Sequence, residues 1–334
     1  MNKKEILFYL KSPDAEKELF RKADEVRKIF CGDEVYIRGI INFSNHCYRN
    51  CLYCGLRRDN RKIKRYRMTP EEIVNAAREI VNSGVSTIVL QSGDDFYYTR
   101  DMISWIIHKI KQMGDVAVTL SVGERPVEDY KAWKEAGADR YLLKHETANP
   151  KLYGKLHPGQ SLKRRVRLLN VLKKMGYQIG AGNIVGLPGQ TIEDLADDLL
   201  FLKDLDVDMA GIGPFIPQKD TPLGNFPGGR LTLTLRVLAL ARIITQDTHL
   251  PATTALATSD PENGLLMGLK VGANVIMPDF TPVSHTERYL IYDNKAKVTL
   301  KKAEDTILKA GRKISKKRGD SLKCTGRQRG FVCI

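Results

Sequence analysis

The feature that most constrains the fold is a regular alternation of strand and helix patterns along most of the chain. Short apolar segments of strand-like composition are each followed by a segment with the 3.6-residue periodicity of an amphipathic helix. Eight such units in about 250 residues predict one complete (β/α)8 barrel of the TIM type rather than a doubly wound sheet, which seldom repeats so evenly. The predicted strands are EVYIRGIINFS, TIVLQS, VAVTLSV, RYLLKHE, QIGAGNIVG, MAGIGPF, PATTAL and ANVIMPD.

Two extensions flank the predicted barrel, which we place at residues 32–285. Residues 1–31 are expected to be helical, because DAEKELFRKADEVRKIF puts its apolar side chains on one stripe. Residues 286–334 are expected to form a cap and a basic tail. Within the barrel, Thr69-Pro70-Glu71-Glu72 carries the signals of a helix start, with Pro at the first helical position and a capping-box Glu.

The chain is basic, with 54 Lys and Arg against 39 Asp and Glu, and much of the excess lies after Lys295. No aromatic residues interleave these late charges as a stacking surface would require, so we expect a solvated helix and a basic end rather than a nucleic-acid site. Removal of residues 313–334 should then leave the functional site unchanged. The chain has no apolar run of 18 residues and its amino-terminal segment is charged, so we expect a cytoplasmic protein without a membrane partner.

Three of the six cysteines lie within eight residues, as Cys47, Cys51 and Cys54 in C-x3-C-x2-C spacing. A structural zinc site normally completes its tetrahedron with a second Cys or His pair, which this sequence lacks, although zinc with a remote ligand stays open. Three thiolates suit a 4Fe-4S cluster and leave one iron free for a small molecule. Cys324 and Cys333, with eight residues between them in the basic tail, are not expected to hold a second cluster.

Polar residues recur where the predicted strands end. Parallel barrels carry their functional groups at the carboxyl ends of the strands, and the cysteine segment follows the first strand on that same face. Some of these side chains are expected only to satisfy backbone groups at the strand ends. The residues are Asn42, Ser44, Gln91, Ser92, Thr119, Ser121, His145, Glu146, Asn183, Thr253 and Thr254.

With Tyr53 before the last cysteine, the cysteine segment resembles the signature of the radical S-adenosylmethionine (radical SAM) superfamily. The resemblance implies that the open iron binds the amino and carboxylate groups of S-adenosylmethionine. Reductive cleavage would then give methionine and a 5'-deoxyadenosyl radical. It also implies that Gln91, Ser92 and Gly93 receive the methionine amino group, and that Ile184 in GNIVG and Ile212 in GIGPFIP lie on the cofactor side.

A narrower resemblance links residues 32–282 with the HydE family of FeFe-hydrogenase maturases, through segments such as CLYCGLRRDN, TIVLQSGDD, AGADRYLLKHETANP, VGLPGQTIEDL and GANVIMP. It implies that Glu146 faces the cofactor ribose or the substrate, with Lys144 beside it, and that Arg165 lies near the cofactor carboxylate. It further implies an anion-binding lining and a tyrosine pair at the cavity mouth. These residues are Arg140, Thr119, Ser121, Thr253 and Thr254 for the lining, and Tyr289 and Tyr292 for the pair.

The residues themselves support these assignments in part. Arg140 and Lys144 are four residues apart on one strand, so their side chains share a face and are expected to enter the barrel. Such charges need a counter-ion, which Glu146 or an anionic ligand would supply. Arg165 lies among other basic residues of a helix, whose periodicity favours a solvated face, and only the family resemblance assigns it to the site.

The function predicted first is a maturase that acts on a small anionic organometallic iron-cysteine precursor on the way to the hydrogenase di-iron subsite. Its partners would be other hydrogenase maturases and a reductant protein such as ferredoxin or flavodoxin. The alternative enzyme is a relative with an organic substrate, similar to 3-methylornithine synthase or biotin synthase. A non-catalytic cluster carrier or a nucleic-acid-binding protein that uses the tail forms a third class.

Overall fold

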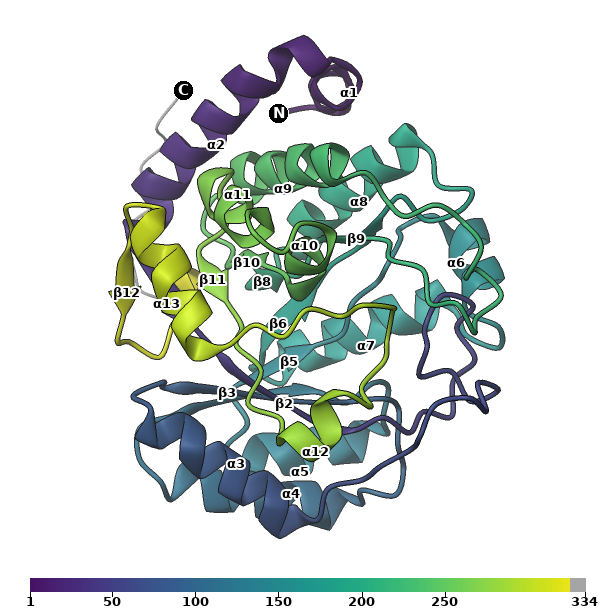
Figure 1. Cartoon of the computed structure of the whole chain (residues 1–334), viewed down its shortest axis with the longest axis vertical. Coiled ribbons are helices and arrows are strands. Elements are labelled where there is room, and N and C mark those ends of the chain that lie inside the picture. The colour runs from purple at the N-terminus through teal and green to yellow at the C-terminus, as the bar shows by residue number, and fades with distance from the viewer. Residues whose placement is uncertain (325–334) are drawn as a thin grey trace.

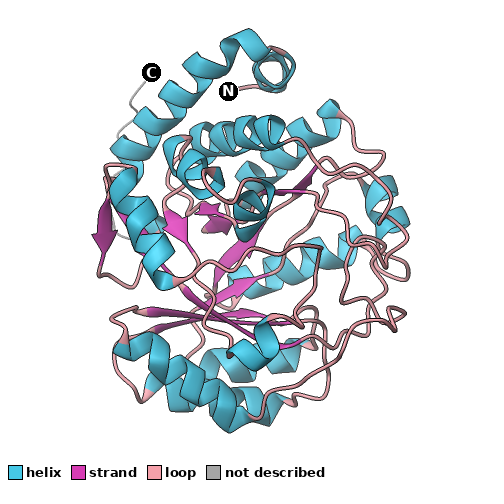
Figure 2. Ribbon diagram, in the orientation of Figure 1, coloured by secondary structure: helices cyan, strands magenta, loops and turns pink. Residues whose placement is uncertain are grey.

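The computed structural model describes residues 1–324 and contains a ring of parallel strands enclosed by helices (Figures 1 and 2). Two sheets build most of the ring, in the strand orders β2-β3-β4-β5-β6-β8 and β10-β11-β1-β12. The strands are β1 (Glu34–Ile37), β2 (Gly39–Ser44), β3 (Thr87–Ser92), β4 (Ala117–Ser121), β5 (Arg140–Leu142), β6 (Gln178–Ala181), β7 (Ile184–Val185), β8 (Met209–Ala210), β9 (Gly213–Pro214), β10 (Pro251–Ala252), β11 (Val275–Ile276) and β12 (Lys313–Ser315).

Two isolated bridges join the sheets into a closed barrel. Met209 of β8 pairs with His249, just before β10, and Ile40 of β2 pairs with Asp279, just after β11. Since β1 and β2 follow each other in the chain, the order around the ring is β1/β2, β3, β4, β5, β6, β8, β10 and β11, all parallel. The barrel predicted from the sequence is therefore confirmed.

The helices lie outside the strands and bury their apolar stripes against them, as Figure 2 shows. Helices α1 and α2 precede the barrel and pack on α8 and α9, which extends the core beyond the ring (Figure 1). The helices are α1 (Lys3–Lys11), α2 (Glu16–Cys31), α3 (Pro70–Asn82), α4 (Arg100–Lys111), α5 (Val127–Glu135), α6 (Pro150–Leu156), α7 (Leu162–Lys174), α8 (Ile192–Leu205), α9 (Leu231–Thr245), α10 (Thr254–Ser259), α11 (Gly264–Lys270), α12 (Val283–Thr286) and α13 (Leu300–Lys309). Within residues 1–324, no helix combines the length and the apolar character that crossing a bilayer requires.

Local signals explain where elements begin and where they break. Thr69 and Glu72 form the expected capping box at the start of α3. The predicted strand QIGAGNIVG is divided into β6 and β7 at Gly182, whose φ of +147° suits glycine and whose Cβ would meet the Gly211 carbonyl oxygen at 2.1 Å. The break turns β7 away from the ring to pair with β9, so it opens the carboxyl end of the barrel.

The carboxyl-terminal segment differs from the expectation of a solvated tail. β12 pairs with β1, and residues 316–321 then cross the amino ends of the strands. Thr87 at the start of β3 donates to the Arg318 carbonyl at 2.7 Å, and His249, just before β10, lies 3.0 Å from the Asp320 carbonyl. We call residues 316–321 the plug. The expectation of a solvated basic end was wrong for residues 313–321, because basic side chains of this segment, such as Lys317 and Arg318, find carboxylate partners on the barrel floor. That removal of residues 313–334 leaves the functional site unchanged stays a prediction.

Candidate active site

The cysteine loop follows β2 and lies over the carboxyl end of the barrel, held by main-chain hydrogen bonds to three distant segments. The Tyr48 amide donates to Asp94 O at 3.1 Å, the Leu52 amide to Leu156 O at 2.9 Å and the Gly55 amide to Ile291 O at 2.9 Å. Gly93, at the end of β3, lets the loop approach, since a Cβ there would lie 2.3 Å from the His46 carbonyl oxygen. The loop is thus placed by the barrel and does not hang free.

The three thiols lie in a partly enclosed environment that disfavours the anion. Burial raises the pKa of Cys47 to about 12 and raises the pKa values of Cys51 and Cys54 as well. Gln160 donates to the Cys51 sulfur at 3.3 Å. Across residues 1–324, no three side chains of Cys, His, Asp or Glu gather tightly enough to surround one metal ion. A cubane 4Fe-4S cluster does not require side chains gathered around one ion, because each thiolate binds a different iron and the sulfurs need not converge on one point.

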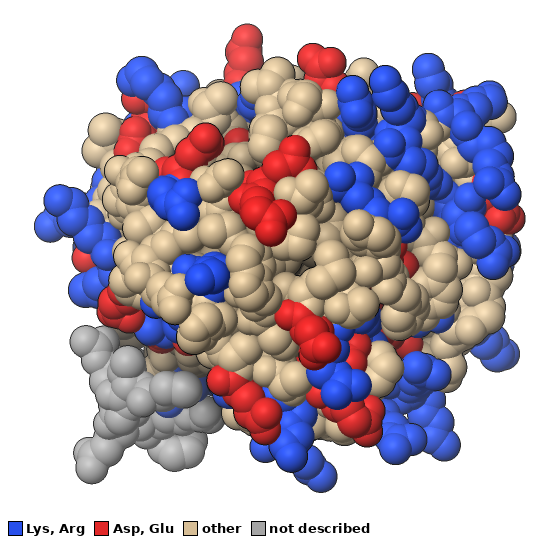
Figure 3. Space-filling model, turned by 90° about the horizontal axis from the view of Figure 1, so that it is seen from below, with Lys and Arg blue, Asp and Glu red and all other residues tan. Residues whose placement is uncertain are grey.

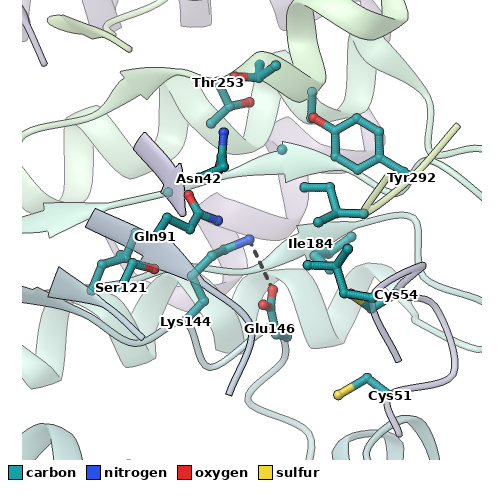
Figure 4. A pocket seen from close by; sticks show the side chains of 18 of the residues that line it. Asn42, Cys51, Cys54, Gln91, Ser121, Lys144, Glu146, Ile184, Thr253 and Tyr292 are labelled. Atoms are coloured by element: carbon teal, nitrogen blue, oxygen red, sulfur yellow. Dashed lines mark ion pairs between the residues drawn. The ribbon is translucent and has the colours of Figure 1, made fainter. Parts of the chain in front are cut away.

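A cavity of about 380 Å³ opens below the loop and gathers residues from nearly every strand of the barrel. Figure 4 shows Cys51 and Cys54 to one side of it, Gln91 and Ser121 to the other, and Lys144 and Glu146 between them. Most of the residues named from the sequence therefore share one cavity. They are Cys47, Cys51, Tyr53, Cys54, Gln91, Ser92, Gly93, Ser121, Lys144, Glu146, Arg165, Ile184, Thr253, Thr254, Tyr289 and Tyr292. Asn42 lines it as well, whereas Ser44, Thr119, Arg140, His145, Asn183 and Ile212 do not.

Lys144 and Glu146 form an ion pair inside the cavity, with 3.0 Å between Nζ and Oε2 (Figure 4). Glu146 has a φ of +63°, a conformation that few residues other than glycine adopt. Its backbone is fixed by β7, because its amide donates to Gly182 O and its carbonyl accepts from the Ile184 amide. A residue whose backbone is held in such a rarely populated conformation points to a functional position.

Glu124 is a site residue that the sequence did not reveal. Its buried carboxylate accepts from Arg165 Nε at 2.7 Å and from Arg49 Nη2 at 3.1 Å, and it pairs with Arg164 at 3.1 Å. Arg165 also donates to the Lys144 carbonyl at 2.6 Å. The solvated face that periodicity favours for Arg165 is therefore not observed. The only sequence signal for Glu124 was its place just after β4, which was predicted from the sequence as the strand VAVTLSV.

His157 is a second unpredicted residue, and it orients Tyr53 of the cysteine loop. Its Nε2 lies 2.9 Å from the Tyr53 hydroxyl and its Nδ1 lies 2.9 Å from the Tyr153 carbonyl. Burial lowers the pKa of His157 to about 4, so the ring is neutral at pH 7. Nδ1 must then carry the proton donated to the carbonyl, which leaves Nε2 to accept from Tyr53.

Arg140 lies at the opposite end of the barrel from the cavity, contrary to expectation. It is 1% exposed and donates to Asp320 Oδ1 of the plug at 3.0 Å and to Gln178 Oε1 at 3.0 Å. Arg140 and Lys144 share a strand face, but at ~3.3 Å per residue their positions differ by roughly 13 Å in depth. Arg38 takes the place of Arg140 in the cavity lining.

A parallel barrel with a C-x3-C-x2-C loop over its carboxyl end defines a protein of the radical SAM class, and residues 41–202 match the family model of the Radical SAM superfamily. The FeFe hydrogenase maturase subunit HydE of Thermotoga maritima is 60% identical over 277 residues, which cover 83% of this chain and 79% of that protein. The 3-methylornithine synthase of Methanosarcina acetivorans is 30% identical, covering 86% of this chain and 81% of that protein. The crystal structure of methylornithine synthase (PylB) superposes with a TM-score of 0.86 at 25% identity, covering 96% of this chain and 95% of that one.

The chain therefore belongs to the HydE family of radical SAM enzymes. Membership implies a 4Fe-4S cluster and S-adenosylmethionine as cofactors.

Proposed function

We propose that this chain is a maturase of the FeFe-hydrogenase pathway, which acts inside the barrel cavity on a small anionic organometallic iron-cysteine precursor and works with the other maturases. The proposal is carried by the cysteine loop, since Cys47, Cys51 and Cys54 line the same cavity as the candidate substrate residues. The 60% identity to HydE of Thermotoga maritima supports the choice of pathway.

The residues present suit the cofactors. Three thiols in an environment that raises their pKa need cationic partners to exist as thiolates, and the irons of a cluster supply them. When bound, the cluster and S-adenosylmethionine supply one-electron reductive cleavage and radical chemistry. We assign the cofactor to Tyr53, Gln91, Ser92, Gly93, Glu146, Arg165 and Ile184, which line the cavity, and to Ile212 on the adjoining β8–β9 segment.

This chain's own residues then bind and orient the ligands. Arg165 is anchored by Glu124 and by the Lys144 carbonyl, so its guanidinium is fixed in direction before a carboxylate arrives. His157 fixes the Tyr53 hydroxyl beside the cysteine loop. Such preorganised donors reduce the entropy lost on binding and keep water from competing for the ligand.

The deeper part of the cavity suits an anion for reasons that differ from the original expectation. Lys144 and Lys295 are each paired with a carboxylate, Glu146 and Asp279. Arg38 lines the cavity, is 4% exposed and donates to the Gly319 carbonyl of the plug at 3.2 Å. It forms no ion pair among the described residues, and its Nε lacks a hydrogen-bond partner. A buried guanidinium without a carboxylate attracts an anionic ligand. Ser121, Thr253 and Thr254 add hydroxyl donors to the same lining.

The test begins with anaerobic reconstitution of the full chain with iron and sulfide. We expect about four irons per chain and an EPR signal that changes when S-adenosylmethionine is added, and Cys51→Ala should abolish both. With reductant and the iron-cysteine precursor, an adenosylated iron product should form, while lysine should not be consumed. Formation of 3-methylornithine from lysine would replace the maturase proposal with the alternative enzyme.

A matched pair of variants tests the anion-binding part of the proposal. Arg38→Gln keeps much of the side-chain volume but removes the charge, so precursor binding should weaken by roughly 2 to 5 kcal/mol while iron content stays constant. Lys309→Gln, on the exposed face of α13, removes the same charge and should change neither quantity. Equal precursor affinity in the wild type and Arg38→Gln would place the anion elsewhere.

A further inference from the structure

A second hollow lies on the outside of the cysteine loop, where the loop meets the segment that follows β3. Two residues, Cys47 and Asp94, line both this hollow and the internal cavity. The hollow and the internal cavity therefore meet at the first candidate cluster ligand. We call this surface the arginine hollow, defined by Tyr48, Arg58, Arg61, Arg65, Arg67, Phe96 and Tyr97.

The arginine hollow is strongly positive. Arg58, Arg61 and Arg67 are exposed, and the exposed Lys62 and Lys64 lie between them in sequence. Figure 3 shows Lys and Arg side chains gathered along the right edge of the molecule, the side on which the loop after β2 lies in Figure 1.

The nearby carboxylates cancel only part of this charge. Arg58 is paired with Asp59 at 3.1 Å and Lys62 with Asp220 at 2.9 Å, whereas Arg61 and Lys64 form no ion pair among the described residues. Asp94 and Asp95 are engaged by Arg49 and Arg67, each at 2.8 Å. The hydrogen bonds of Arg65 go to main-chain carbonyls, including Leu56 O at 3.0 Å and Arg57 O at 2.7 Å, so its charge is held in place without being neutralised by a carboxylate. An extended positive field of this kind attracts an acidic partner and speeds its association.

Three exposed aromatic side chains border the same charges. Tyr48, Phe96 and Tyr97 are 39%, 48% and 55% exposed. The Tyr48 and Phe96 rings lie 4.8 Å apart, and Arg125 lies 4.7 Å from the Phe96 centroid. Clustered aromatic residues with arginine are typical of protein interfaces, and an exposed apolar group of this kind marks an interaction site.

The proposed function needs an electron from outside the protein. Cys31, Cys47, Cys51 and Cys54 are free thiols, and among the described residues no group of three metal-binding side chains offers another redox centre. An electron that reaches the cluster must therefore come from a partner that approaches the cysteine loop closely. Because Cys47 lines the arginine hollow as well as the internal cavity, a partner docked in the hollow lies next to a candidate cluster ligand.

We propose that the arginine hollow is the docking surface for an acidic one-electron carrier protein of the flavodoxin or ferredoxin type. The inference rests on the proposed function, because it assumes a cluster behind Cys47. In the transfer, the carrier loses one electron and the cluster gains it, and no bond forms or breaks at the interface. Redox encounters use small interfaces, below about 1,200 Å² in total, so the complex is expected to be weak and sensitive to salt.

The geometry of the rings favours a protein over a nucleic acid. Bases stack on aromatic faces that are open to solvent. Here a guanidinium group covers one face of each of two rings, with Arg49 4.4 Å from the Tyr48 centroid and Arg67 4.6 Å from the Tyr97 centroid. A partner would contact the ring edges and the remaining arginine N–H donors. Carboxylates on the surface of an acidic protein fit those donors.

The experiment compares two charge-reversal variants of the full chain, both reconstituted anaerobically. Arg61→Glu/Lys64→Glu reverses two charges in the hollow and its border, and Lys4→Glu/Lys17→Glu makes the same change in net charge on the exposed faces of α1 and α2. Stopped-flow absorbance gives the second-order rate of cluster reduction by reduced flavodoxin at low and high salt. We expect the hollow variant to be at least tenfold slower at low salt, the control to stay within twofold of the wild type, and all three to be reduced equally by dithionite.

Each outcome bears on one part of the inference. If the hollow variant is reduced by flavodoxin as fast as the wild type while dithionite reduces both, the docking surface is wrong and the proposed function stands. If cluster reduction slows as much in the control variant as in the hollow variant, the attraction depends on the net charge of the protein and not on this surface, and the docking surface is again wrong. If the wild type takes up no cluster, both proposals fall. Tighter binding of an RNA oligonucleotide than of flavodoxin, lost in the hollow variant, would reassign the surface to nucleic acid.

Discussion

At the amino end of the barrel, the buried charge of Arg140 is neutralised by the chain itself, whereas at the carboxyl end a carboxylate oxygen in the cavity has no hydrogen-bond donor. Arg140 is held by Asp320 and Gln178, both within 3.0 Å. In contrast, Glu146 Oε2 has no hydrogen-bond partner, although Glu146 is paired in charge with Lys144. Since buried polar groups are normally satisfied, the difference separates a structural end from a ligand-binding end.

The largest effect on stability should follow from deletion of the segment that contains the plug, because this removes the partners of the buried charge at the amino end of the barrel. Deletion of residues 313–334 removes β12 and Asp320 and leaves Arg140 buried without its carboxylate. Breaking a buried ion pair costs about 3 to 5 kcal/mol, and each further buried donor left unpaired costs about 1 to 3 kcal/mol. We therefore expect the free energy of unfolding to fall by at least about 5 kcal/mol, as measured by urea denaturation.

A point variant provides the control for the deletion. Asp320→Ala should account for much of the loss, whereas Asp305→Ala removes an exposed carboxylate paired with Lys301 and should change stability by less than about 0.5 kcal/mol. A truncated chain as stable as the full chain would show that the plug merely rests on the barrel.

The plug was missed in the sequence for a physical reason. Its residues are basic and polar, with no apolar periodicity, so composition alone predicted a solvated tail. Its burial depends on Arg140, Gln178 and His249, which lie far apart in the chain and meet only when the barrel closes. The eight strands were predicted because each carries its own apolar pattern. Partnerships of this kind have no local signal.

The pH dependence of stability sharpens the comparison at the carboxyl end. Burial lowers the pKa of His157 from 6.5 to about 4, so the unfolded chain binds a proton at a pH where the folded chain does not. Stability should therefore fall as the pH drops from 6.5 toward 4, and His157 should contribute on the order of 3 kcal/mol across that window. Denaturation of the cluster-free chain at pH 7 and pH 4.5 measures the loss.

Variants isolate the histidine from the other groups that titrate. His157→Gln retains an acceptor for Tyr53 and a donor for the Tyr153 carbonyl but does not titrate, so its pH dependence should be smaller than that of the wild type. His108→Gln, on the exposed face of α4, should leave the pH dependence unchanged. An unaltered profile for His157→Gln would mean that the imidazole reaches solvent.

A smaller effect is expected from Gly93→Ala, which tests how closely the cysteine loop must approach β3. The added Cβ would lie 2.3 Å from the His46 carbonyl oxygen and 2.7 Å from the Cys47 Cβ. The loop must shift, so stability should fall by about 1 to 3 kcal/mol and iron uptake should drop. Gly154→Ala in α6, whose Cβ would meet nothing within 4 Å, is the matched control and should keep full iron content.

The residues that line the candidate site were predicted better than the residues that hold them in position. The cysteines, Lys144, Glu146 and the two threonines that follow β10 were named because strand ends in a barrel converge on one face. Arg140 was misplaced because periodicity gives the face of a strand but not the depth in the barrel. Glu124 and His157 were missed because each acts through a neighbour, Arg165 or Tyr53, that lies far away in sequence.

The smallest effect on stability is expected from Thr119→Val, a variant that also tests whether this hydroxyl binds a ligand. Thr119 is 2% exposed, its Oγ1 has no hydrogen-bond partner, and it does not line the cavity as the structure stands. Thr119→Val replaces the hydroxyl with a methyl group of similar volume. Because an unpaired buried hydroxyl is unfavourable, the variant should be unchanged or more stable by up to about 1 kcal/mol, as measured by urea denaturation.

The same variant tests the anion-binding role predicted for Thr119. If a bound substrate reaches this hydroxyl, precursor affinity should fall in Thr119→Val although stability does not. If affinity also stays constant, Thr119 belongs with Arg140 among residues that the family resemblance assigned to the lining but that bind no ligand here. A loss of more than about 2 kcal/mol in stability would contradict both outcomes, since it would require a hydrogen bond that the folded chain does not show.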